Sequence, residues 1–195
     1  MAYDYYLAGQ KTHVIPVELE CSMQGLTEAA ITNLQTGAGL NADIVAAVVR
    51  CYENYKDQPR DICRELNGCG VTGSITVDDK CRSIFAYLVE NVTYRLDDPG
   101  KQLIKSPARL LADGCGDCKS LTMFVSSCLH CCKIPHIIRF VNFDGGTQYS
   151  HVYPVAIDED GNEIILDACE KDDKGYPIYN YAREYGRKKD FYYEQ

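Results

Sequence analysis

Three residues of the chain, Cys118, His151 and Asp167, are of the types that together activate a sulfur nucleophile. Cys118 follows Gly116-Asp117 and precedes a segment with a helical apolar stripe, so we expect it in the first turn of a helix. A helix N-terminus presents unpaired N–H groups and about half a positive charge. That field favours the thiolate over the thiol, and the same N–H groups can hold an oxyanion when the sulfur attacks a carbonyl.

The antiparallel hairpin that carries His151 is expected to bring Asp167 beside it. A turn centred on Glu159 places His151 directly opposite Asp167 on one face of the sheet. Directly opposed side chains have Cβ atoms roughly 4.5–5.5 Å apart, which allows an imidazole–carboxylate hydrogen bond. His151 would then exchange the proton with Cys118, and Asp167 would orient the imidazole and favour its charged form.

The elements that position these residues follow from apolar periodicity and from helix signals. The expected helices run from a cap at Asn41 or Asp43 through Tyr52, from Pro59 through Leu66, over 77–91, briefly after Ser106-Pro107, and over 119–132. The expected strands cover 136–143, 149–157 and 163–167. Helices followed by an antiparallel meander predict the α+β class, with a core helix packed on the sheet.

Several stretches of this sequence also carry a family resemblance. They occur in order as Lys105-Ser-Pro-Ala-Arg-Leu-Leu111, Gly116-Asp-Cys-Lys-Ser-Leu-Thr122, Ile134-Pro135, Tyr149-Ser-His-Val-Tyr153 and Leu166-Asp167. Over roughly 77–168, about half the chain, the sequence resembles the transglutaminase-like family, which belongs to the papain-like cysteine-protease fold. The resemblance implies a catalytic triad of Cys118, His151 and Asp167.

The resemblance further implies acyl transfer from an amide of a protein or peptide through a thioester on Cys118. Animal transglutaminases use a tryptophan to hold the oxyanion, and this chain has none, which favours hydrolysis by a peptidase, amidase or deamidase over cross-linking. Papain-like enzymes use an upstream glutamine instead, and Gln102 is the candidate here. The backbone N–H of Cys118 is expected to be the other oxyanion donor. No cofactor is expected, because the chain lacks an Asp-rich loop of calcium-site spacing.

The chain divides by composition into an N-terminal helical segment over 1–76, a catalytic core over 77–170 and a tyrosine-rich tail over 171–195. Nine of the 15 tyrosines fall in residues 1–6 or 176–193. Tyrosines are large and amphipathic, so these termini are expected to pack on the body or to contact a partner.

Composition excludes several classes of protein. The net charge of −8 disfavours nucleic acid as a partner. The basic run over 183–189 is expected to be exposed to solvent and not to form a binding patch. No apolar run approaches the roughly 18 residues of a membrane span. No signal segment is seen, so we expect a cytoplasmic protein whose 11 cysteines are mostly buried thiols. The resemblance to the transglutaminase-like family, which has many bacterial and phage-encoded members, implies a bacterial or phage origin.

Three alternatives stay open at this stage. Cys115 and Cys118 have zinc-knuckle spacing, and Cys128, His130, Cys131 and Cys132 follow, so the chain could be a zinc-binding module. Cys115 and Cys118 could also form a redox pair or a regulatory disulfide that blocks the nucleophile. Finally, the chain could keep the fold as a non-enzymatic assembly or binding protein.

Overall fold

The computed structural model describes residues 3–7, 10–14, 31–33, 40–68, 75–99 and 101–194, with side chains over 41–66, 75–99 and 101–194. Its helices are α1 (Leu40–Tyr55), α2 (Arg60–Gly68), α3 (Val77–Asn91), α4 (Pro107–Asp113) and α5 (Cys118–Cys131). Its strands are β1 (Tyr3–Leu7), β2 (Gln10–Val14), β3 (Ile31–Asn33), β4 (Thr93–Tyr94), β5 (Leu103–Lys105), β6 (Cys115–Gly116), β7 (His136–Asn142), β8 (His151–Ile157), β9 (Glu163–Ile165) and β10 (Arg187–Tyr193).

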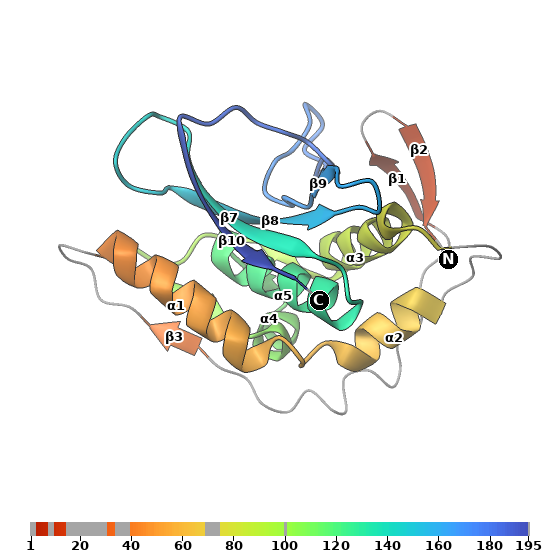
Figure 1. Cartoon of the computed structure of the whole chain (residues 1–195), viewed down its shortest axis with the longest axis horizontal. Helices are drawn as coiled ribbons and strands as arrows, with labels where there is room; N and C mark the ends of the chain where they lie inside the picture. Colours follow the sequence, from red (N-terminus) through yellow and green to blue (C-terminus); the bar gives the residue numbers. More distant parts are fainter. Residues whose placement is uncertain are drawn as a thin grey trace.

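A four-stranded antiparallel sheet in the order β10-β7-β8-β9 forms the centre of the molecule, and α1, α5 and α3 lie along one side of it (Figure 1). The expected mixed class of helices and antiparallel sheet is confirmed. The other described pairings are short: β1 with β2, β3 with β5, and β4 with β6, of which only the last is parallel. No helix in the described ranges is both long enough and apolar enough to span a membrane.

Helix α5 is the core helix, and the three turns that follow its first residue, Cys118, are buried. The sequence predicted one apolar face for it, but every residue from Lys119 to Leu129 is buried. The reason is its central position, since α5 contacts α1 to α4 as well as β5, β7 and β8. Burying a single large apolar side chain contributes roughly 1.5–3 kcal/mol, so this packing holds the N-terminus of α5 at a defined place against the sheet.

The helical face of the sheet carries two apolar clusters. In one of them, Val48 and Tyr52 of α1 pack with Ile138, Phe140 and Val152 of the sheet and with Met123 of α5. In the other, α2 and α3 pack on α5. An apolar stripe was predicted for 77–91, and α3 has the expected bounds. Of that stripe, Cys81, Ile84, Phe85 and Leu88 are buried, and Val89 is partly buried.

Two local expectations are wrong. Helix α1 begins at Leu40, so Asn41 and Asp43 lie within its first turn and do not cap it. The β8–β9 register is also displaced by two residues, because Val155, not Tyr153, pairs with Ile165. The cause is the turn: the Asp158 carboxylate accepts the N–H groups of Asp160 and Asn162, and Gly161 adopts a φ of 83°, which centres the turn on Asp160.

The C-terminal segment contributes to the same sheet. Strand β10 pairs with β7 along its whole length, from Arg187 opposite Asn142 to Tyr193 opposite His136. Tyr193 stacks on His136 and Tyr179 is buried, so these two C-terminal tyrosines pack on the body as expected, whereas Tyr176, Tyr181 and Tyr192 are exposed. The side chains of residues 1–6 lie outside the described part of the chain, and the division at residues 76 and 170 stays a prediction.

Candidate active site

The N-terminus of α5 presents Cys118 with one free backbone donor. Asp117 is the N-cap residue, and its carboxylate accepts the backbone N–H groups of Lys119 and Ser120. Within the described residues, no acceptor takes the N–H of Cys118 itself. The cap therefore leaves free the single N–H that is closest to the thiol, where an oxyanion would form.

The glycine two residues before Cys118 is required by close packing. A Cβ at Gly116 would lie 2.6 Å from Leu110 Cδ1 and 2.9 Å from Ser120 Cβ, so a larger residue would push the start of α5 away from α4. The same segment pairs with β4, with Arg95 N–H donating to the Gly116 carbonyl at 2.8 Å. These contacts explain why the sequence has glycine directly before the capping aspartate.

His151 and Asp167 meet despite the displaced register. His151 Nε2 lies 2.6 Å from Asp167 Oδ2, and both side chains are largely buried. Asp167 follows β9, and the backbone N–H of Cys169 donates to its other carboxylate oxygen at 3.0 Å. A displacement of two residues preserves the face of the sheet, so Asp167 reaches the imidazole diagonally instead of from directly opposite.

The protonation of His151 depends on its neighbours. Burial of the imidazole lowers its pKa, but the hydrogen bonds to Asp167 and Cys118 outweigh burial and raise the pKa of His151 from 6.5 to about 10. Because Nε2 faces Asp167, Nδ1 is the ring nitrogen left for Cys118. The imidazole is therefore positively charged at neutral pH and can give a proton to a leaving group.

The raised pKa of His151 predicts the alkaline side of the pH dependence. The pKa of His151 is higher in the folded protein than in the unfolded chain, where it is 6.5. Protonated His151 therefore stabilises the fold fully below pH 6.5, and this contribution is lost as the pH rises through about 10. We expect the His151 imidazolium to lose its proton near pH 10. Asp167→Asn should lower this titration by about one to two pH units, because it removes the neighbouring negative charge. A histidine titration followed by NMR in both proteins measures the shift, and an unmoved titration in Asp167→Asn would contradict it.

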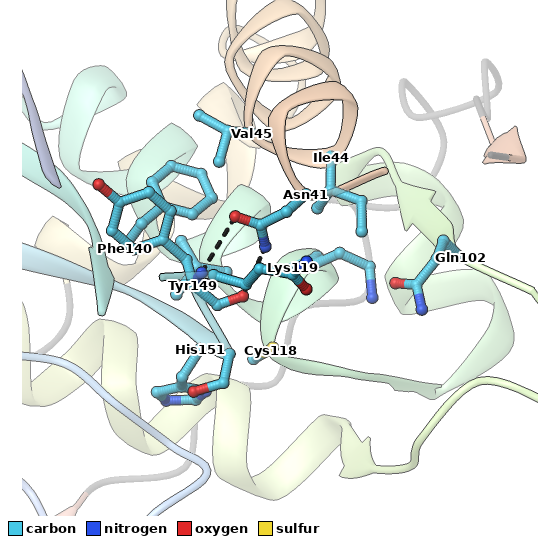
Figure 2. Close-up of a pocket in the computed structure, with 12 residues that line it drawn as sticks. Asn41, Ile44, Val45, Gln102, Cys118, Lys119, Phe140, Tyr149 and His151 are labelled. Carbon is cyan, nitrogen blue, oxygen red and sulfur yellow. Dashed lines mark hydrogen bonds between the residues drawn. The ribbon is translucent and has the colours of Figure 1, made fainter. Parts of the chain in front are cut away.

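Cys118 and His151 line one cavity of about 300 Å³, and Gln102 lines it too (Figure 2). In Figure 2, Gln102 lies on the opposite side of Cys118 from His151. The hydroxyl of Thr122, one turn after Cys118, donates to the Val152 carbonyl at 3.0 Å and so ties α5 to the strand that carries His151. The structure thus brings Cys118, His151 and Gln102 to one cavity, with Asp167 behind His151.

Asn41, which the sequence indicated only as a candidate helix cap, lies in one wall of this cavity. Its side-chain amide pairs with the backbone of Tyr149, donating to the Tyr149 carbonyl at 2.7 Å and accepting the Tyr149 N–H at 3.0 Å (Figure 2). This double hydrogen bond joins α1 to the segment just before His151. The two residues are 108 positions apart, so local patterns could not reveal the contact.

Lys119 is a second residue that the sequence analysis missed. Its ammonium forms ion pairs with Asp117 and with Asp97, the latter at 3.4 Å, and the three side chains are almost completely buried. Burial lowers the pKa of Lys119, but the two carboxylates outweigh burial and raise it. Lys119 therefore balances the negative charge of the capping Asp117 directly behind the thiol, where an uncompensated carboxylate would oppose a thiolate.

One group of possible metal ligands occurs among the described residues. The ligand atoms of His151, Asp167 and Cys169 all lie within 4.8 Å of one another, and nitrogen, oxygen and sulfur are ligands that zinc accepts. Cys115, which the zinc alternative needs, is not in this group but in strand β6, where it pairs with Thr93. Cys115 and Cys118 are both free thiols in this structure.

Comparisons with known proteins bear on the fold. A proposed protease from Parabacteroides distasonis matches 66% of this chain with a TM-score of 0.50 and 12% identity, and the match spans 26% of that protein. A proposed cysteine protease from Cytophaga hutchinsonii matches 84% of the chain and 60% of its own length, with a TM-score of 0.46 and 15% identity. Calcium-bound LapG of Legionella pneumophila matches 69% of the chain and 76% of its own length, with a TM-score of 0.44 and 16% identity. No protein-family model and no curated protein matches the sequence.

The likeness to the Parabacteroides protein concerns the fold alone, because only 12% of the aligned residues are identical. Two thirds of the chain therefore share the fold of a proposed protease. The chain spans about a quarter of that protein's length, so the activity of the longer protein is not carried over with the fold. Function has to be argued from the side chains at the site.

Proposed function

We propose that the chain is a cysteine-dependent enzyme of the transglutaminase-like kind, which acts on amide bonds of a protein or peptide. One observation carries the proposal: Cys118, at the start of a buried helix, lines a cavity together with His151, whose imidazole is 2.6 Å from the Asp167 carboxylate. Nucleophile, base and orienting carboxylate in this order are the arrangement that activates a thiol. The fold that two thirds of the chain share with a proposed protease is compatible with this chemistry.

In the proposed mechanism, the Cys118 sulfur attacks the carbonyl carbon of the amide. The carbon–nitrogen bond breaks, and the leaving amine or ammonia takes the proton of the His151 imidazolium, which leaves a thioester on Cys118. Water, or a second amine, then attacks the thioester and gives its proton to His151, and the carbon–sulfur bond breaks to regenerate the thiolate. Asp167 holds the imidazole in position throughout.

We assign the oxyanion that forms in each step to two donors. The backbone N–H of Cys118 is free because Asp117 accepts the next two N–H groups of α5. The side-chain amide of Gln102 lines the same cavity and is the second donor. With no tryptophan in the chain to serve this role, hydrolysis is the favoured outcome and transamidation the alternative.

A non-enzymatic assembly or binding role is the competing proposal. It would suit a chain whose nucleophile is covered or whose orienting residues are displaced. Cys118 is instead partly exposed and borders a cavity of about 300 Å³, which favours an enzyme.

Alkylation of the cysteines at a series of pH values, resolved by peptide mass mapping, tests the proposal. We expect Cys118 to react with iodoacetamide fastest among the free thiols below pH 7, because the His151 imidazolium stabilises its thiolate. Turnover of a peptide library, followed by mass, should fall in proportion to the labelling of Cys118. Persistent turnover after complete alkylation of Cys118 would refute the thioester mechanism. If Cys115 and Cys118 were both protected from alkylation until a chelator was added, the zinc alternative would be indicated.

A further inference from the structure

A second cavity, of about 590 Å³, adjoins the cavity of Cys118. Three cationic residues, Arg50, Arg187 and Lys189, line it, and we call it the basic pocket. Asn41, Val45 and Tyr149 line both cavities, so the two cavities are neighbours and these three residues form the boundary between them. A substrate bound at Cys118 would reach the basic pocket by passing over the hydrogen-bonded Asn41–Tyr149 pair.

The three cations come from two elements of the fold, α1 and β10, which line the pocket. Arg187, Lys189 and Phe191 occupy every second position of β10. All three therefore lie on the same face of the strand, toward α1. Arg50 lies on α1, with Val49 and Ala46 of the same helix also lining the pocket. The pocket thus combines an apolar floor with cations on opposite sides, which suits the methylene groups and the charged end of an acidic side chain.

The cations of the pocket are available for a ligand. All three are exposed, and in residues 40–68, 75–99 and 101–194 no carboxylate forms an ion pair with any of them. Their neighbour Lys188, on the other face of β10, is instead paired with Asp190 at 3.1 Å. An exposed patch of three unpaired cations is notable in a chain whose net charge is −8.

Arg187 is also held in position before any ligand arrives. Its guanidinium lies 5.1 Å from the centroid of the Tyr149 ring and donates one hydrogen bond to the Thr147 carbonyl at 2.8 Å. A guanidinium has five N–H groups, so several donors stay free. Lys189 is likewise fixed over the ring of Phe191, with Nζ 5.0 Å from its centroid. Side chains that are already ordered lose little entropy when they bind an anion.

We propose that the basic pocket binds an acidic side chain, Asp or Glu, of the substrate near the amide that Cys118 attacks. The inference rests on the proposed function, since it names the substrate class of that same site: a protein or peptide segment with a carboxylate flanking the scissile amide. The three cations give this specificity by charge complementarity, and Arg187 can also form paired hydrogen bonds to the carboxylate.

Selection from a random peptide library on Cys118→Ala protein tests this inference, because that variant binds substrate without consuming it. We expect Asp and Glu to be enriched about tenfold over the input library at a position near the amide, in line with a charge-assisted hydrogen bond. The enrichment should be lost when Arg50→Gln and Lys189→Gln are added. It should also weaken as the sodium chloride concentration rises, since the pocket is exposed.

Matched variants separate a local effect from a change in net charge. Lys188→Gln removes a charge from the same strand but from its other face, and Arg64→Gln removes an exposed charge of α2 that is paired with Asp61. Both should retain the acidic enrichment. Equal enrichment with and without Arg50 and Lys189, or no acidic enrichment at all, would overturn the inference. If acidic peptides are enriched but the wild-type protein does not turn them over, the basic pocket is supported and the proposed function is refuted.

Discussion

The His151→Ala variant should lose amide turnover by on the order of 10⁴-fold or more while keeping its fold. Without the imidazole, the site loses the group that protonates the leaving amine and deprotonates the attacking water. The Cys118 thiolate also loses the positive charge that stabilises it. Initial rates on a peptide substrate, together with thermal unfolding followed by circular dichroism, measure both parts of the expectation.

A second histidine provides the control for this variant. His130 lies near the end of α5, is partly exposed and pairs with Asp57 at 3.7 Å, away from Cys118. His130→Ala should keep kcat within about twofold of the wild-type value, as expected for a change outside the site. Alkylation of Cys118 below pH 7 should slow in His151→Ala and not in His130→Ala. Full activity of His151→Ala would remove the histidine from the mechanism.

The Lys119→Met variant should lower the free energy of unfolding by about 3–5 kcal/mol, the largest loss of stability that we expect from a single change near the site. Methionine keeps the length of the side chain but leaves the carboxylates of Asp117 and Asp97 buried without their cation. The side chains of Lys119 and Asp117 are only 8% and 4% exposed, so water cannot replace the lost ion pairs. Urea unfolding of both proteins gives the difference directly.

An exposed ion pair close to the same site supplies the comparison. Lys101 pairs with Asp98 at 3.1 Å, but their side chains are 53% and 77% exposed. Lys101→Met should therefore change stability by no more than about 0.5 kcal/mol. Similar losses in Lys101→Met and Lys119→Met would show that burial of the Lys119 cluster is not what stabilises the start of α5.

Local patterns in the sequence determined the helices that carry the site. The stripe from Cys81 to Leu88 predicted α3 with its observed bounds, because apolar residues at helical spacing can be buried together only on a helix. The Gly116-Asp117 loop before a segment with a helical apolar stripe predicted that Cys118 lies in the first turn of α5, and the structure adds that Asp117 caps this helix. Such signals act within a few residues and can be read without knowledge of the rest of the chain.

The meeting of His151 with Asp167 was predicted from strand periodicity, although the predicted register was wrong by two residues. Side chains alternate between the faces of a strand, so a displacement of two residues keeps both side chains on one face. The turn at Asp158 decided the register through hydrogen bonds of its carboxylate, and a turn of that kind is hard to distinguish in sequence from one centred a residue earlier.

The sequence by itself thus determined the class of fold, the helix that carries Cys118 and the side of the sheet shared by His151 and Asp167. Only the tertiary structure decided the walls around them: Asn41 against Tyr149, Lys119 between two carboxylates, and Arg50 across from β10. The physical reason is the range of the interactions. Periodicity and capping depend on neighbours along the chain, whereas these contacts join segments that become neighbours only when α1, α5 and the sheet pack together.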